Sequence, residues 1–277
     1  MSSSQNHEHD PVGAISEAGA TGRTAEIFAD IRSVMNVPIV TAIWRGLAGV
    51  DGDLEAVWTA VRPVIENGQA DQFILALEKD VVFPTPSNTA SEELASFDCL
   101  KADQSEILMI VRAYNRANAL SLIALTALAR TPGKAFYFKE MVSARPECSA
   151  LKPLLEKDQI SSENWNILER TTFIGAERRN PAVPTLWRHL VYWPELIDLA
   201  TRRFLPLNED GSMFQAVDDV MEFVERAAPS LGIGIDRTVA ISDSSLDMVE
   251  GYIGRQPSVC RMTTVGRSLE RWLMAEP

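Results

Sequence analysis

The sequence is short of cysteine, of basic residues and of long apolar runs, and each shortage excludes a class of protein. Its three cysteines, Cys99, Cys148 and Cys260, lie far apart and form neither a CxxC pair nor a zinc-binding pattern, which favours a reduced, cytoplasmic protein. Lys and Arg (26) are outnumbered by Asp and Glu (38), so the net charge of −12 disfavours nucleic acid and anionic lipid as partners. The longest uncharged apolar run, Ala117 to Ala129, is shorter than the roughly 20 residues of a membrane span.

The first 18 residues are polar, and we predict that they form a disordered tail. They contain no basic segment followed by an apolar one, so they do not resemble a secretory signal. His7 and His9 stand there beside Glu8 and Asp10. A disordered segment does not preorganise metal ligands, and we therefore predict no metal site.

The alternation of apolar and polar residues that is typical of strands is also scarce, and apolar residues instead recur three or four positions apart. This spacing predicts an all-α fold. The clearest stripe runs along a long helix predicted over 106–130, which Thr131-Pro132-Gly133 ends. Its members are Ile107, Val111, Tyr114, Asn118, Leu122, Leu125 and Ala129. Other stripes are Leu54, Val57, Val61 and Val64, then Ile197, Ala200 and Phe204, and then Phe214, Val217, Met221 and Val224, the last ended by Pro229 and Gly232. The last helix is predicted from about residue 245, interrupted by Pro257.

Two segments half a chain apart repeat one pattern. Residues 38–47 are PIVTAIWRGL and residues 181–190 are PAVPTLWRHL, so Pro, Val, Trp, Arg and Leu recur at the same offsets. Two copies indicate a duplicated half-domain and not a solenoid. We predict pseudo-symmetric helical halves over 19–130 and 163–277, joined by a connecting segment over 131–162. A face shared by two related halves is a common place for a pocket.

The repeat carries several candidate binding residues. Arg45 and Arg188 could together hold a carboxylate, although an arginine can equally stack on aromatic rings or pair with a surface carboxylate. Trp44 and Trp187 precede them and suit either the core or a pocket wall. His189, the histidine outside the tail, replaces Gly46 of the first copy and is a candidate base.

Asn118 is the most conspicuous polar residue on an apolar helical face, one turn after Tyr114. Burying an amide costs free energy unless it is hydrogen-bonded, so Asn118 is either a satisfied core residue or a site residue. Tyr252 and Gln256 keep the spacing of Tyr114 and Asn118. The two halves could therefore present a pair of amides to one cavity, with Tyr252 shaping it.

Three short parts of the chain carry a family resemblance: Asp30-Ile31-Arg32 with Val37-Pro38, then Tyr114 to Asn118, then Trp193-Pro194. In these segments, and over about residues 24–270, the sequence resembles the type I 2-haloacid dehalogenases, which act on both enantiomers. The resemblance implies two pseudo-symmetric helical halves similar to the alkylhydroperoxidase-D-like fold. It further implies a homodimer that hydrolyses small 2-haloalkanoic acids without metal or organic cofactor. An Asp activates water for direct attack at C2, and an Asn, matched here by Asn118, helps to hold that water.

The family's catalytic Asp has no counterpart in this chain, because Leu186 holds its position. There is no carboxylate between Glu177 and Glu195. Losing such a base typically costs about 100- to 10,000-fold in rate. His189, three residues from Leu186, and Asp198 on the next predicted helix are the candidate replacements.

Three functions therefore stay open from the sequence. The first is hydrolysis of 2-haloacids with a relocated base. The second is a different reaction on a small organic acid, elimination or isomerisation, and the third is a non-catalytic helical binding protein. Resemblance of fold does not choose among them, since function depends on the site.

Overall fold

The computed structural model describes residues 14–50, 52–87, 98–133, 150–177, 182–254 and 259–275, and within these ranges every regular element is helical. The predicted all-α class is thereby confirmed, while the internal duplication stays a prediction. The tail residues 1–13, Pro181 at the start of the second copy, and Gln256 lie outside the described ranges. The main helices are α1 (Gly22–Met35), α2 (Ala42–Leu47), α3 (Asp53–Glu66), α4 (Gln69–Asp80), α6 (Asp98–Ala129), α7 (Ser162–Thr171), α8 (Thr185–His189), α9 (Pro194–Phe204), α10 (Pro206–Glu209), α11 (Ser212–Leu231), α12 (Asp243–Ile253) and α13 (Val259–Met274).

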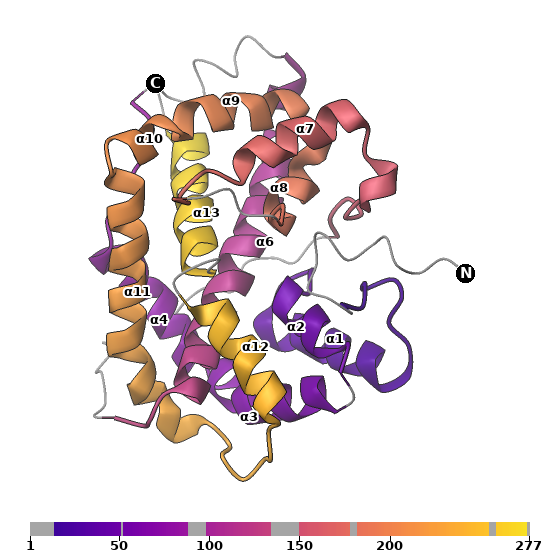
Figure 1. Cartoon of the computed structure of the whole chain (residues 1–277), viewed down its shortest axis with the longest axis vertical. Helices are drawn as coiled ribbons and strands as arrows, with labels where there is room; N and C mark the ends of the chain where they lie inside the picture. Colours follow the sequence, from indigo (N-terminus) through magenta and orange to yellow (C-terminus); the bar gives the residue numbers. More distant parts are fainter. Residues whose placement is uncertain are drawn as a thin grey trace.

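Helix α6 is the centre of the molecule (Figure 1). It packs against α3 and α4 from the first predicted half and against α11, α12 and α13 from the second. Apolar side chains of both halves belong to one buried cluster that includes Val61, Leu122 and Leu269. The two predicted halves therefore share a single hydrophobic core, and each depends on the other for burial of its apolar face.

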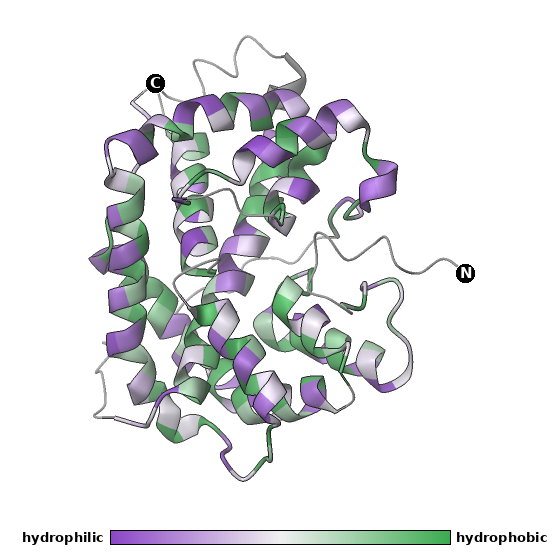
Figure 2. Ribbon diagram, in the orientation of Figure 1, coloured by the Kyte–Doolittle hydropathy of each residue, from purple (hydrophilic) through white to green (hydrophobic). Residues whose placement is uncertain are grey.

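The apolar stripes predict most of the buried faces. Leu54, Val57, Val61 and Val64 are all buried in α3, as their helical spacing requires. On α11 the predicted Val217 and Val224 are buried, whereas Phe214 and Met221 are partly exposed. Met213 and Val220, each one residue earlier, are buried in their place. Figure 2 shows the division of polar and apolar residues along these helices.

Local sequence signals set several helix ends. The Ser161 hydroxyl accepts a hydrogen bond from the Asn164 amide at 3.2 Å and caps α7, and Ser242 caps α12 in the same way. Pro194 occupies the first turn of α9, where its missing N–H costs nothing. Helix α11 ends at Leu231, directly before Gly232, as predicted, and Pro229 lies in its last turn. The last predicted helix consists of α12 and α13, which lie on either side of the break predicted at Pro257, a residue outside the described ranges.

In the described part of the chain, none of the helices combines the length and the apolar character that crossing a membrane requires.

Candidate functional site

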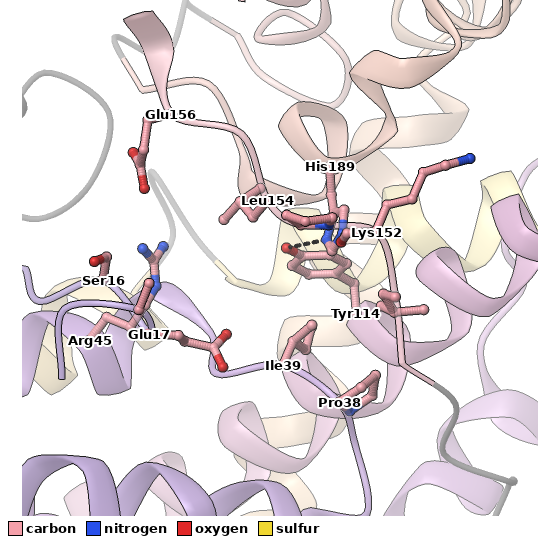
Figure 3. A pocket seen from close by; sticks show the side chains of 13 residues that line it. Ser16, Glu17, Pro38, Ile39, Arg45, Tyr114, Lys152, Leu154, Glu156 and His189 are labelled. Carbon is pink, nitrogen blue, oxygen red and sulfur yellow. Dashed lines mark hydrogen bonds between the residues drawn. The ribbon is translucent and has the colours of Figure 1, made fainter. Parts of the chain in front are cut away.

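A cavity of about 280 Å³ opens between the two repeat segments, and it is the candidate site (Figure 3). The first repeat contributes Pro38, Ile39 and Arg45, and the second contributes His189 from the end of α8. Tyr114 enters from the middle of α6. The remaining lining residues are Ser16, Glu17, Ala18, Leu151, Lys152, Pro153, Leu154 and Glu156.

One wall comes from the end of the predicted tail, so the tail boundary needs correction. The Ile15 amide donates to the Arg45 carbonyl at 3.0 Å. The Glu17 carboxylate accepts from the Val40 amide at 2.8 Å and pairs with Arg32 at 2.7 Å. Residues 14–18 therefore pack against the first repeat segment and against α1.

The opposite wall is residues 150–156, called here the 150–156 strap, which belong to the predicted connecting segment. The Lys152 ammonium pairs with Glu106 at 2.6 Å and lies 4.5 Å from the centre of the Trp193 ring. The Tyr192 hydroxyl donates to the Pro153 carbonyl at 2.7 Å. These contacts turn the Lys152 side chain away from the cavity (Figure 3) and fix the strap against α6 and the segment after α8.

His189 and Tyr114 form the polar centre of the cavity. His189 Nε2 lies 2.6 Å from the Lys152 carbonyl oxygen, which only accepts, so Nε2 carries the proton. In the neutral imidazole Nδ1 is then an acceptor, and the Tyr114 hydroxyl donates to it at 3.3 Å. The Lys152 carbonyl of the strap thus determines the tautomer of His189, and the Tyr114 hydroxyl of α6 donates to the lone pair on Nδ1.

Burial keeps both groups uncharged. Burial lowers the pKa of His189 and the charge of Arg188 lowers it further, against the opposing effect of the Lys152 carbonyl. Burial also raises the pKa of the Tyr114 phenol to about 12, although the charges of Arg45 and Arg188 oppose this. At neutral pH the pair is therefore a phenol donor and a neutral imidazole acceptor.

The lowered pKa of His189 predicts a dependence of stability on pH. The unfolded chain takes up a proton at histidine near the ordinary value of 6.5, whereas the folded chain does so only at lower pH. The free energy of unfolding should therefore fall as the pH drops below about 6.5, by at most about 1.4 kcal/mol per pH unit. We expect urea unfolding between pH 5 and 7.5 to show this slope in the wild type and a smaller one in His189→Gln. Equal slopes would contradict the prediction, since the tail histidines are common to both proteins.

The two arginines of the repeat are equally buried but differ in their relation to the cavity. Arg45 lines the cavity and is 2% exposed, whereas Arg188, also buried, does not line the cavity as described and acts through its charge on Tyr114 and His189. Leu186 is buried with a methyl group 3.7 Å from the Cβ position of Gly266 in α13. Leu186 thus packs from α8 against α13, as a buried apolar residue.

Four other predicted site residues lie outside the described lining. Trp44 donates its indole N–H to Ser121 at 3.0 Å and packs edge-on against Trp58, and Trp187 is fully buried. Asn118 is buried in α6, one turn beyond Tyr114. The Tyr252 hydroxyl is buried beside Thr41 and Ser121, and burial raises its pKa. The helical spacing placed Tyr114 and Asn118 on one face, but the cavity reaches only the first of them.

Asp198 does not approach the cavity. Its carboxylate pairs with Arg170 at 2.5 Å and with Arg202 at 3.1 Å. These contacts place it on the outer side of α9, against α7. Of the two predicted replacement bases, the structure brings only His189 to the cavity.

The cavity also holds carboxylates that the sequence did not predict. Glu156 caps the short helix η1 (Lys157–Gln159) through a capping box, and Glu17 is held by Arg32 and Val40. Both lie in irregular segments, where helical periodicity gives no signal. The capping pattern before Gln159 was the one available clue to Glu156, and it indicates a helix start, not a site.

No protein-family model matches this chain, and no curated protein matches it. Solved structures do. A D-2-haloacid dehalogenase mutant in complex with D-2-CPA superposes with a TM-score of 0.65 at 14% identity, covering 94% of this chain and 92% of the other. D-2-haloacid dehalogenase with L-LA gives a TM-score of 0.65 at 14% identity, covering 94% and 93%. This chain therefore has the helical fold of the 2-haloacid dehalogenases.

Proposed function

We propose that this protein hydrolyses small 2-halocarboxylic acids in the cavity between the two repeat segments, with His189 as the base. The observation that carries the proposal is the hydrogen bonding of His189. Its Nε2–H is fixed on the Lys152 carbonyl, so the basic nitrogen, Nδ1, is directed to the Tyr114 side of the cavity. A neutral imidazole with a defined tautomer suits a general base.

The size of the cavity and the presence of Arg45 in its lining support this substrate class, and Glu17 of the same lining is paired with Arg32. A volume of about 280 Å³ suits a molecule of a few carbon atoms. Arg45 brings a permanent positive charge to the lining, and its guanidinium can bind a carboxylate with two parallel hydrogen bonds. A small carboxylate held by Arg45 would have its C2 atom between the arginine and the Tyr114–His189 pair.

Leu186 fits this proposal as a packing residue. The family resemblance places a catalytic Asp at its position, and a buried leucine cannot accept a proton. His189 lies one helical turn further along α8 and lines the cavity. We therefore propose that the basic function has moved by one turn along the same helix.

The test is halide release from D- and L-2-chloropropionate and from 2-bromopropionate. We expect release by the wild type, and a KM about 10- to 100-fold higher in Arg45→Met, because a hydrogen-bonded charged pair contributes about 1.5–3 kcal/mol. We also expect a large loss of kcat in His189→Gln. The measurement is chloride or bromide formed per enzyme over time, with circular dichroism of each variant to verify folding.

Two variants serve as controls. Arg202→Met removes an arginine that is 58% exposed on α9, and Asp198→Asn neutralises its partner. Both should leave turnover unchanged, and a loss of turnover in Asp198→Asn would contradict the assignment of His189. Halide release from 3-chloropropionate alone would favour elimination. Binding of these acids without release by any of them would favour the non-catalytic binding protein.

A further inference from the structure

We propose that Tyr114 is a catalytic residue that relays the proton from the attacking water to His189. This inference rests on the proposed function and assigns the group that touches the water. The inference depends on which atoms face the cavity and on which of these atoms already have hydrogen-bond partners.

Both nitrogens of His189 have partners. Nε2–H donates to the Lys152 carbonyl at 2.6 Å, and Nδ1 accepts from the Tyr114 hydroxyl at 3.3 Å. A neutral imidazole nitrogen has a single lone pair, so Nδ1 cannot accept from a water while it accepts from Tyr114. The Tyr114 oxygen has two lone pairs, one of which accepts from the Thr185 hydroxyl, and it belongs to a side chain that lines the cavity, so one lone pair is left for a water. The first acceptor that a water meets beside His189 is therefore this oxygen.

The proposed step is balanced in atoms and charge. A water in the cavity gives a proton to the Tyr114 oxygen while the Tyr114 proton passes to His189 Nδ1. The hydroxide oxygen forms the bond to C2 of the substrate, and the C2–halogen bond breaks with its electron pair leaving on the halide. The products are the 2-hydroxy acid, halide and an imidazolium, which returns its proton to solvent.

Neighbouring groups act on both charges that the relay creates, the negative charge on the Tyr114 oxygen and the positive charge on His189. Arg45 and Arg188 lower the cost of negative charge on the Tyr114 oxygen, and both act on that group by their charge. Glu106 favours the imidazolium form of His189, and the Lys152 carbonyl continues to accept from Nε2–H. Arg188 acts against the imidazolium. Glu17 opposes negative charge on the Tyr114 oxygen. These five groups come from residues 14–18, α2, α6, α8 and the 150–156 strap, and they determine the pH profile.

The experiment compares Tyr114→Phe with the wild type in two measurements. The first is kcat for halide release, which should fall by about 100-fold or more, since general-base assistance typically contributes that much. The second is the ¹⁵N shift of the His189 ring nitrogens as a function of pH. The wild type should show a proton on Nε2, and Tyr114→Phe should raise the His189 pKa because the donor to the neutral Nδ1 is lost.

Tyr252→Phe is the matched control, because it removes a buried hydroxyl beside Thr41 and Ser121, outside the described lining of the cavity. It should change kcat by less than about threefold, well below the loss expected when a general base is impaired. Unchanged or faster halide release in folded Tyr114→Phe would overturn the relay, because Nδ1 would then act alone. A proton on Nδ1 in the wild type would also overturn it. If the wild type releases no halide, the proposed function fails, while the ¹⁵N measurement still decides whether Tyr114 donates to His189.

Discussion

Asp71→Ala is expected to lower the free energy of unfolding by about 3–5 kcal/mol, because it leaves a buried positive charge without its partner. Asp71 of α4 and Arg116 of α6 are 6% and 9% exposed, and the Arg116 guanidinium donates to the Asp71 carboxylate at 2.5 Å. Without the carboxylate, the guanidinium is held in a site that excludes most water. Urea unfolding monitored by tryptophan fluorescence measures the change.

The pair also supports the candidate site. Arg116 Nε donates to the carbonyl of Met35, the last residue of α1, at 2.7 Å. Asn36 then takes a left-handed conformation (φ 51°) and the chain turns into the segment that contains Pro38 and Ile39. Weakening Arg116 therefore disturbs one wall of the cavity, and we expect halide release to fall together with stability.

Two further variants separate charge from packing. Asp71→Ala combined with Arg116→Met removes both charges and should recover much of the lost stability, because replacing both partners of a buried pair is far less costly than removing one. Glu26→Ala removes a partner of the exposed Arg23–Glu26 pair and should leave the urea unfolding midpoint nearly unchanged. An equal cost for Asp71→Ala and Glu26→Ala would contradict the prediction.

The fold was largely predictable because helical periodicity survives in the sequence wherever a helix is half buried. The stripe of α3 is buried at each predicted position, and Pro194 marks the start of α9. Pro229 and Gly232 mark the end of α11: the proline lies in the last turn, where it removes one N–H, and the helix ends two residues later at Leu231.

The site was predictable only in part, because it joins segments that no local pattern connects. Tyr114 and His189 are 75 positions apart, and each was notable alone, one on a helical face and the other in the repeat. Lys152 contributes through its carbonyl oxygen, which every residue has, so its side chain gives no hint of this contact. Asp198 was chosen because it lies close to Leu186 in the sequence. In the structure it lies on the side of α9 that faces α7, where it pairs with Arg170.

Gly266→Ala should lower the free energy of unfolding by about 3 kcal/mol, the upper end of the range for overpacking in a core. Gly266 is buried in α13, and a Cβ atom there would overlap the side-chain oxygen of Asn115 on α6. Asn115 has little freedom to move away. Its amide nitrogen donates to the Gly266 carbonyl at 3.0 Å and to Glu270 at 2.8 Å, so rotation of the amide would break both bonds.

Gly251→Ala is the matched control, because Gly251 also lies inside a helix, α12, but a Cβ atom there meets nothing within 4 Å. Alanine has the higher helix propensity, so this variant should gain up to about 1 kcal/mol. Opposite signs for the two Gly→Ala changes, measured by urea unfolding, are the expected result, and stabilisation by both would contradict it. Since Leu186 packs against the same glycine, separation of α13 from α6 would also loosen α8, which carries His189. The close contact at Gly266 thereby connects the stability of the core to the position of the proposed base.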